Sequence, residues 1–148
     1  MAARAMPVLL CGKTVGIGRI VARGLMPEYE VVHFSTPDTV KDDVPALLAG
    51  KDAPASSAKN DVGTGNRDTP PRVVILGKAF TAESAGKIRE TCHGPDAEKA
   101  AWVVGDPDAP VPPPPYDDSY AVRVTADVKK VLNRWREQGE KDGETLYW

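Results

Sequence analysis

The chain has 148 residues, of which 41% are hydrophobic and 27% are charged, and its formal net charge is -2 with a pI near 5.7. A chain of this length favours one domain over residues 1–148, and the slightly acidic balance excludes a general nucleic-acid binder and a polybasic membrane-surface segment. No stretch approaches the roughly 20 apolar residues that a transmembrane helix needs. We therefore expect a cytoplasmic protein with no nucleic-acid or membrane partner.

Cysteine and histidine are too sparse for a metal centre. The chain has two cysteines, Cys11 and Cys92, and two histidines, His33 and His93, none of them in a paired motif. A structural zinc site needs four ligands at tight spacings. Aspartates at positions 106, 108, 117 and 118 lie beside prolines, where acidic side chains are usually solvated. We expect no bound metal.

The first half of the chain alternates strand and helix signals. Residues 7–11 (PVLLC) form an apolar run that ends at a glycine, which predicts a strand buried on both faces. Residues 29–34 (YEVVHF) predict a second strand. Thr39 is placed to cap a helix that runs to Leu48, which Pro45 shortens or kinks. Between the two strands, apolar side chains at helical spacing predict a helix that ends before Pro27. Its apolar face consists of Ile17, Ile20, Val21 and Leu25.

The second half begins with an irregular segment. Residues 50–71 hold one large apolar side chain, Val62, and predict a mobile surface loop. Residues 72–77 (RVVILG) predict the third strand, and Thr81 is placed to cap a helix that reaches Cys92.

The C-terminal part completes the pattern. Residues 100–104 (AAWVV) predict a fourth strand, and residues 110–115 (PVPPPP) predict an extended, proline-rich connector. The last helix is expected from about Thr125 to Gln138. The aromatic tail of residues 145–148 (TLYW) is expected to dock on this chain or on a partner chain.

This alternation predicts an α/β fold. We expect a small Rossmann-like or flavodoxin-like parallel sheet of about four strands, in the order 2-1-3-4, with helices on both faces. Ligands of such sheets bind at the carboxyl ends of the strands, at the point where the strand order reverses. Residues 12–18, 33–36, 77–80 and 105–106 follow the predicted strands at that edge.

The turn after the first strand carries the strongest chemical signal. Its glycines let a phosphate approach the backbone, the helix behind it offers free N–H groups, and its basic residues add positive charge. The candidate binding residues of this turn are Gly12, Lys13, Thr14, Gly16, Ile17, Gly18 and Arg19.

Residues 12–19 (GKTVGIGR) resemble the cofactor loop of short-chain dehydrogenases/reductases, whose pattern is (T)GxxxGIG, often followed by Arg. Cys11 stands where that family has Thr, and residues 76–79 (LGKA) stand where it has an Asn-Asn-Ala-Gly stretch. The resemblance implies a dinucleotide site that Gly77 and Lys78 help to line. The family's catalytic Tyr-x-x-x-Lys pair is missing, so the resemblance implies the binding loop and not the dehydrogenase activity.

The end of the second strand bears on the cofactor. Residues 33–36 (HFST) contain no Asp or Glu to hold a ribose 2′-hydroxyl. Ser35, Thr36 and Arg19 suit a 2′-phosphate better, which favours NADP over NAD.

Two alternatives remain open. In the first, the glycine turn only packs helix against strand, and the protein is a non-catalytic Rossmann-derived module that forms a homodimer or binds proteins through the last helix and the aromatic tail. In the second, Cys11 is the nucleophile of a phosphatase-like or thiol enzyme, with its pKa lowered by the helix dipole, Lys13 and Arg19 and with Asp106 as the acid. The phosphatase motif Cys-x5-Arg is not matched, because seven residues separate Cys11 from Arg19.

Overall fold

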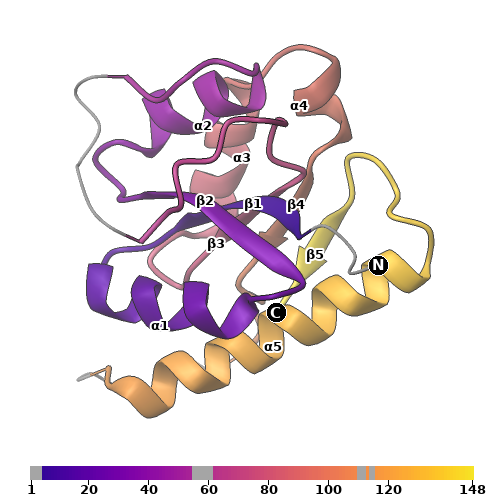
Figure 1. The fold of residues 1–148 in the computed structure, drawn as a ribbon. Helices are drawn as coiled ribbons and strands as arrows, with labels where there is room; N and C mark the ends of the chain where they lie inside the picture. The colour runs from indigo at the N-terminus through magenta and orange to yellow at the C-terminus, as the bar shows by residue number, and fades with distance from the viewer. Residues whose placement is uncertain (1–4, 55–61, 110–112, 114–115) are drawn as a thin grey trace.

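The computed structural model describes residues 5–54, 62–109, 113 and 116–148. Strands and helices alternate along most of these residues (Figure 1). The elements are β1 (Met6–Cys11), α1 (Val15–Leu25), β2 (Tyr29–Ser35), α2 (Val40–Leu48), β3 (Val73–Leu76), α3 (Ala82–Glu90), α4 (Pro95–Lys99), β4 (Ala101–Val104), α5 (Asp118–Glu137) and β5 (Thr145–Tyr147).

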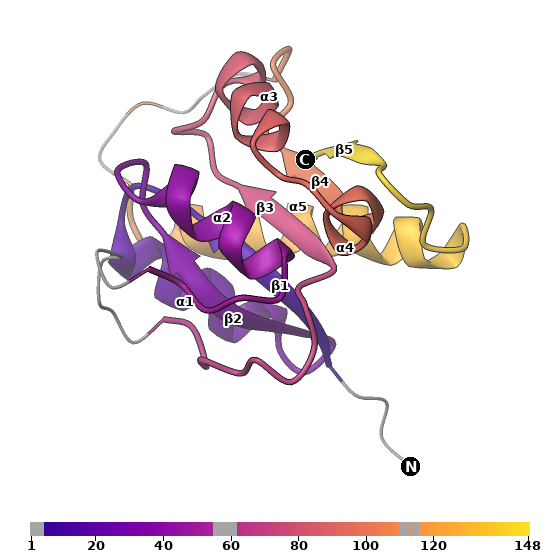
Figure 2. The same cartoon turned by 90° about the horizontal axis from the view of Figure 1, so that it is seen from above.

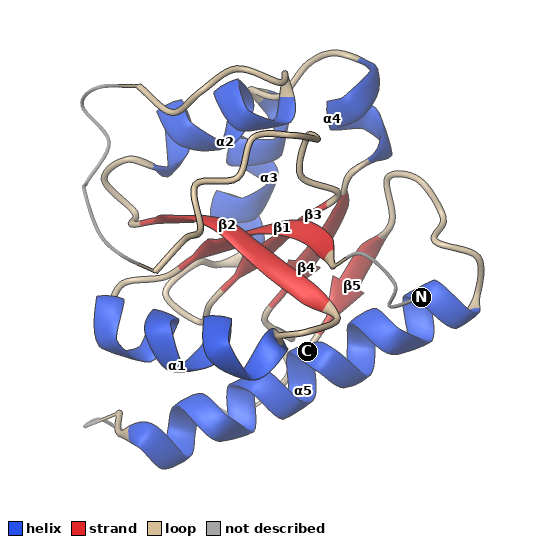
Figure 3. Cartoon of the chain, viewed as in Figure 1, coloured by secondary structure: helices blue, strands red, loops and turns tan. Residues whose placement is uncertain are grey.

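The strands form one parallel sheet in the order β2-β1-β3-β4-β5 (Figure 3). The predicted Rossmann-like or flavodoxin-like α/β fold and the order of the first four strands are confirmed. The tail adds a fifth strand at the edge, so it docks on this chain. Cys11 at the end of β1 is level with Ser35 of β2 and Leu76 of β3, which brings the segments after these strands to one edge.

Helices cover both faces of the sheet. Helices α1 and α5 lie on one face, and α2, α3 and α4 lie on the other (Figures 1 and 2). Successive residues of β1 enter two separate cores: Leu10 packs on the α1–α5 side and Leu9 on the α2–α3 side. This explains why the strand is apolar at every position. Each core also buries one tryptophan, Trp135 in the first and Trp102 in the second.

Helix ends differ in how well the sequence predicted them. Thr81 caps α3 as expected, in a reciprocal pair of hydrogen bonds with Ser84. Thr39 was predicted to cap α2 but makes no side-chain capping bond, because its own backbone is already helical. Pro45 lies inside α2, and the helix continues to Leu48. The short helix α4 was not predicted.

The start of the last helix was predicted wrongly. Helix α5 begins at Asp118 and not near Thr125, because the side chain of Asp117 accepts a hydrogen bond from the backbone N–H of Tyr120 and caps an earlier turn. This earlier start carries both Tyr116 and Tyr120 to the carboxyl edge of the sheet.

The segment 50–71 lies partly outside the described residues, which omit 55–61. Its second part runs along the outer edge of β2: the N–H of Thr64 bonds to the carbonyl of Val31 at 2.9 Å, and that of Gly65 to the carbonyl of Val32 at 3.0 Å. Val62 is buried in the first core. The proline-rich connector falls almost wholly outside the described residues, with Pro113 as the exception. In the described parts of the chain, no helix has the length and apolar character needed to cross a bilayer.

Two glycines of α1 should respond oppositely to alanine. A Cβ at Gly18 would lie 2.4 Å from Phe34 Cε2, whereas a Cβ at Gly16 would meet nothing within 4 Å. Gly18→Ala should therefore destabilise the fold by about 1–3 kcal/mol through overpacking, and Gly16→Ala should stabilise it by about 0.5 kcal/mol through helix propensity. Urea unfolding measures both free energies, and equal effects of the two substitutions would contradict the prediction.

Candidate functional site

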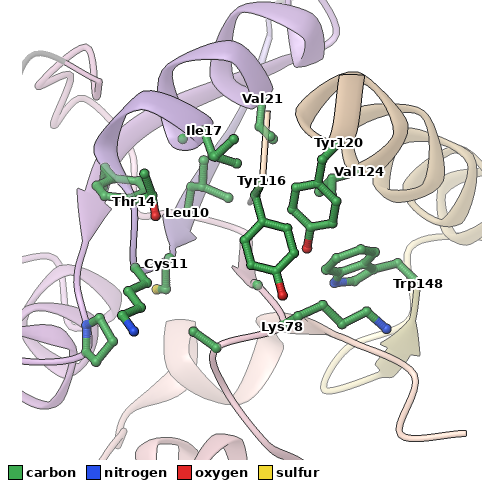
Figure 4. A pocket seen from close by; sticks show the side chains of 17 residues that line it. Leu10, Cys11, Thr14, Ile17, Val21, Lys78, Tyr116, Tyr120, Val124 and Trp148 are labelled. Carbon is green, nitrogen blue, oxygen red and sulfur yellow. The ribbon is translucent and has the colours of Figure 1, made fainter. Parts of the chain in front are cut away.

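A cavity of about 480 Å³ opens at the carboxyl edge of the sheet. Its floor includes Leu10 and Cys11 at the end of β1, and its sides include the turn into α1 and the segment 77–79 after β3 (Figure 4). Strands β2 and β3 lie on opposite sides of β1, so the cavity lies where the strand order reverses. This is where open parallel sheets bind their ligands.

The structure divides the predicted binding residues into two groups. The first lines the cavity: Gly12, Lys13, Thr14, Ile17, Gly18, Gly77 and Lys78. The second is not part of its lining: Gly16, Arg19, Ser35 and Thr36. The residues after β1 and β3 are thus brought together, whereas β2 and the segment after it contribute Phe34 and Pro37 to the lining instead of the predicted Ser35 and Thr36.

The glycines of the turn have different roles. Gly18 is buried against the Phe34 ring, so it allows α1 to approach β2 closely. Gly16 is exposed with open space beside it. Thr14 at the N-cap makes no side-chain capping bond, so its hydroxyl does not compete for the N–H groups of the first turn of α1. Packing accounts for Gly18 but not for Gly16.

Ser35 and Thr36 are engaged elsewhere. Ser35 is 2% exposed and donates its hydroxyl to Asp43 Oδ2 of α2 at 2.8 Å. The same carboxylate oxygen lies 3.0 Å from His33 Nε2. Thr36 starts the turn into α2, with its N–H 3.3 Å from Thr39 Oγ1. Ser35 therefore links β2 to α2 through this hydrogen bond. The buried carboxylate of Asp43 lies next to Ser35, where a 2′-phosphate was predicted to bind.

A second wall of the cavity comes from distant parts of the chain. Tyr116 and Tyr120 at the start of α5 stack with ring centroids 4.6 Å apart and planes tilted by 34°. The indole of Trp148 completes this wall (Figure 4). Neither tyrosine is among the binding residues that the sequence predicted. The missed signal is a pair of tyrosines four residues apart, Tyr116 and Tyr120, on either side of the capping Asp117.

Lys78 reaches this aromatic wall. Its ammonium lies 4.9 Å from the centroid of the Trp148 ring and 3.4 Å from the carbonyl oxygen of Asp106. Burial, and next the neighbouring Tyr116, raise the pKa of Tyr120, so this phenol is neutral at physiological pH. No ion pair joins Lys13 or Lys78 to a carboxylate within the described residues. The cavity therefore combines apolar and aromatic walls with unneutralised positive charge.

Metal ligation has no support in the described part of the chain, where no three His, Cys, Asp or Glu side chains gather as a metal site would require. Asp117 serves instead as the cap of α5, and Asp106 accepts the N–H of Asp108.

Comparison of the sequence with known proteins identifies a relative over nearly the whole chain. No protein-family model and no solved structure matches the chain. Kojic acid related protein 6 of Aspergillus oryzae is 31% identical to it over 144 residues, which cover 97% of this chain and 86% of that protein. The chain belongs to the same family as that protein. The alignment includes nearly all of this chain, so it spans the elements that build the cavity.

Cys11 lies in the floor of the cavity, but its environment is the reverse of an activating one. The thiol is fully buried, and this burial raises its pKa, with smaller contributions in the same direction from Asp43 and Cys92. The expected lowering by the helix dipole and the basic residues is therefore outweighed. A thiolate nucleophile at neutral pH is disfavoured.

Alkylation kinetics test this environment. Iodoacetamide at neutral pH should label Cys92 before Cys11, because Cys11 is 1% exposed and Cys92 is only half-buried. In Cys92→Ser the folded protein should stay almost unlabelled, and urea should make Cys11 reactive. Peptide mass spectrometry over time measures both rates. Rapid labelling of Cys11 in the folded protein would support the thiol-enzyme alternative instead.

Proposed function

We propose that this protein binds a nucleotide-type cofactor, with a phosphate at the turn of residues 12–18 and a ring in the cavity. The observation that carries the proposal is the position of the cavity at the reversal point between β1 and β3, lined by the turn and by Gly77 and Lys78. Its volume of about 480 Å³ falls within the range of small-molecule sites.

The turn offers what a phosphate needs. The first turn of α1 presents N–H groups at the positive end of the helix dipole, and Lys13 supplies a charge at the same place. Leu10, Ile17 and Val21 give an apolar surface beside the turn, on which a nucleotide ring would lie. Gly16 has no packing neighbour and lies on the first turn of α1, just outside the cavity lining, so we expect it to leave room for the phosphate of a ligand.

The preference for NADP over NAD rests on Arg19 and on the lack of an acidic side chain in residues 33–36, and neither Arg19 nor Thr36 is part of the cavity lining. Ser35 no longer supports it, since its hydroxyl is bonded to Asp43 and a second phosphate beside that carboxylate would be repelled. Redox chemistry is not part of the proposal, because the sequence lacks the Tyr-x-x-x-Lys pair that short-chain dehydrogenases use for catalysis.

A non-catalytic dimerisation module is the second candidate. Val122 on α5 is 61% exposed and Tyr147 on β5 is 53% exposed, so the last helix and the edge strand present apolar side chains to the surface. This candidate predicts a dimer that forms without any ligand in the cavity.

Melting temperatures test the proposal. Purified protein is titrated with NADPH, NADH, ATP and FMN, and with kojic acid because the relative's name links that protein to it. A site filled to 100 times its Kd should stabilise the fold by roughly 2.7 kcal/mol, which for this size is a shift of about 8 °C. We expect a shift with NADPH and a smaller one with NADH.

Gly16→Asp should abolish the shift, because it adds a negative charge to the first turn of α1, where the phosphate is proposed to bind, while the added Cβ meets no protein atom. Gly86→Asp is the matched control, since Gly86 is also an exposed helical glycine with open space, but on α3. The control should keep the full shift. No shift with any nucleotide would overturn the proposal, and a ligand-free dimer in sedimentation would then favour the dimerisation module.

A further inference from the structure

We propose that the same cavity contains a second subsite, which binds a planar aromatic ring carrying an anionic group such as a carboxylate. The ring would lie against Tyr116, Tyr120 and Trp148, and the anionic group would bind the ammonium of Lys78. This inference deepens the proposed function and rests on it in so far as the cofactor shares the cavity. It assigns the other ligand that the cavity accepts beside the nucleotide.

The aromatic wall is the first support. Tyr116 directly precedes the N-cap of α5 and Tyr120 lies in its first turn; the two rings stack on each other, and Figure 4 shows both facing the cavity beside the indole of Trp148. Ile17 of α1 contributes to the apolar lining of the same cavity. Aromatic faces favour flat ring systems over aliphatic ones, because ring pairs gain energy beyond the area that they bury.

The tryptophan is held in a fixed position. Its indole N–H donates to the carbonyl of Leu76 at 2.9 Å, and its backbone N–H donates to the carbonyl of Val104 at 3.1 Å. Its carbonyl accepts the N–H of Asp106 at 2.9 Å. Three hydrogen bonds from two other segments thus orient the ring before any ligand arrives, and a preorganised surface binds with a smaller entropic cost.

The charge selects the ligand class. The ammonium of Lys78 contacts only neutral groups in the described residues, namely the face of Trp148 and the carbonyl of Asp106. A carboxylate beside the indole would give this cation a charge-assisted hydrogen bond in a half-buried place, which is stronger than either contact. The same positive charge repels cationic ligands, so the aromatic wall is not a cage for ammonium groups.

The two walls also explain why the subsite is distinct from the phosphate turn. Lys13 comes from the segment after β1 and Lys78 from the segment after β3, so each ligand has its own cation. Trp148 belongs to the tail behind β5, which lies on the side of the sheet away from β2. The aromatic acid would therefore bind at the β3–β4 side of the cavity and the phosphate at the β1 side.

Calorimetric titration of the full chain with three probes tests the ligand class. The probes are 2-naphthoate, its neutral amide, and the saturated decalin-2-carboxylate. We expect 2-naphthoate to bind at least tenfold more tightly than either of the others. Equal affinities for the three, or no binding of 2-naphthoate, would overturn the proposal.

Variants assign the interactions to residues. Lys78→Met should remove the preference for the acid over the amide, and Trp148→Leu should remove the preference for the aromatic over the saturated acid. Lys87→Met and Tyr147→Leu are matched controls on exposed positions of α3 and β5, and should leave both preferences unchanged. Tyr120→Leu provides a second test of the aromatic wall if Trp148→Leu unfolds. A control that weakens 2-naphthoate binding as much as its partner variant would contradict the assignment.

Gly16→Asp separates this inference from the proposed function. It should abolish the NADPH shift and leave 2-naphthoate binding intact. Naphthoate binding without any nucleotide binding would support the subsite and overturn the proposed function. Nucleotide binding together with equal affinities for the three probes would support the proposed function and overturn the aromatic subsite.

Discussion

The packing of α5 against α1 is the contact on which the cavity depends. Gly24 of α1 makes it possible, because a Cβ there would lie 2.5 Å from Thr125 Cγ2 of α5. Lys129 then joins the two helices, with its ammonium 2.9 Å from the carboxylate of Glu28 and 3.1 Å from the carbonyl of Gly24. A parallel sheet requires the chain to cross back between β4 and β5, and α5 is that crossover. Its first turn and the end of β5 therefore both lie at the carboxyl edge, which is how Tyr120 and Trp148 meet.

The sequence predicted the elements whose signal is local and strong. The three central strands, β1, β3 and β4, are continuous apolar runs, since both of their faces are covered, and the edge strand β2 is rich in β-branched and aromatic residues. Strand β5 is different: Thr145 and Tyr147 are exposed and only Leu146 packs on the core. A three-residue edge strand buried on one side has no pattern that separates it from a tail. Its pairing with β4 is decided by the crossover.

The residues of the cavity also fall into those that the sequence predicted and those that it did not. The turn and Lys78 were predictable because each follows directly from the end of a strand. Ser35 does not line the cavity, and the strand pattern explains why. Alternate residues of a strand point to opposite faces, so Phe34 faces α1 and Ser35 faces α2 with Asp43. Tyr116 and Trp148 could not be placed at the cavity from the sequence, because that requires the register of β5 and the true start of α5.

Two positions at the start of α1, Thr14 and Gly16, lack the contact or residue that would stabilise the helix most. Thr14 stands at an N-cap, where a side-chain hydrogen bond is worth about 1 kcal/mol, yet it makes none. Gly16 stands inside the helix, where alanine would be better by up to about 1 kcal/mol, and no neighbour requires a glycine. Helices α3 and α5 are capped by side chains, whereas α2 lacks a cap as α1 does, so it is the combination of an uncapped end with an unpacked glycine that distinguishes α1. This arrangement beside a cavity at the reversal point of the sheet supports the proposed phosphate site, because a ligand there could bond to the N–H groups that a cap would have satisfied.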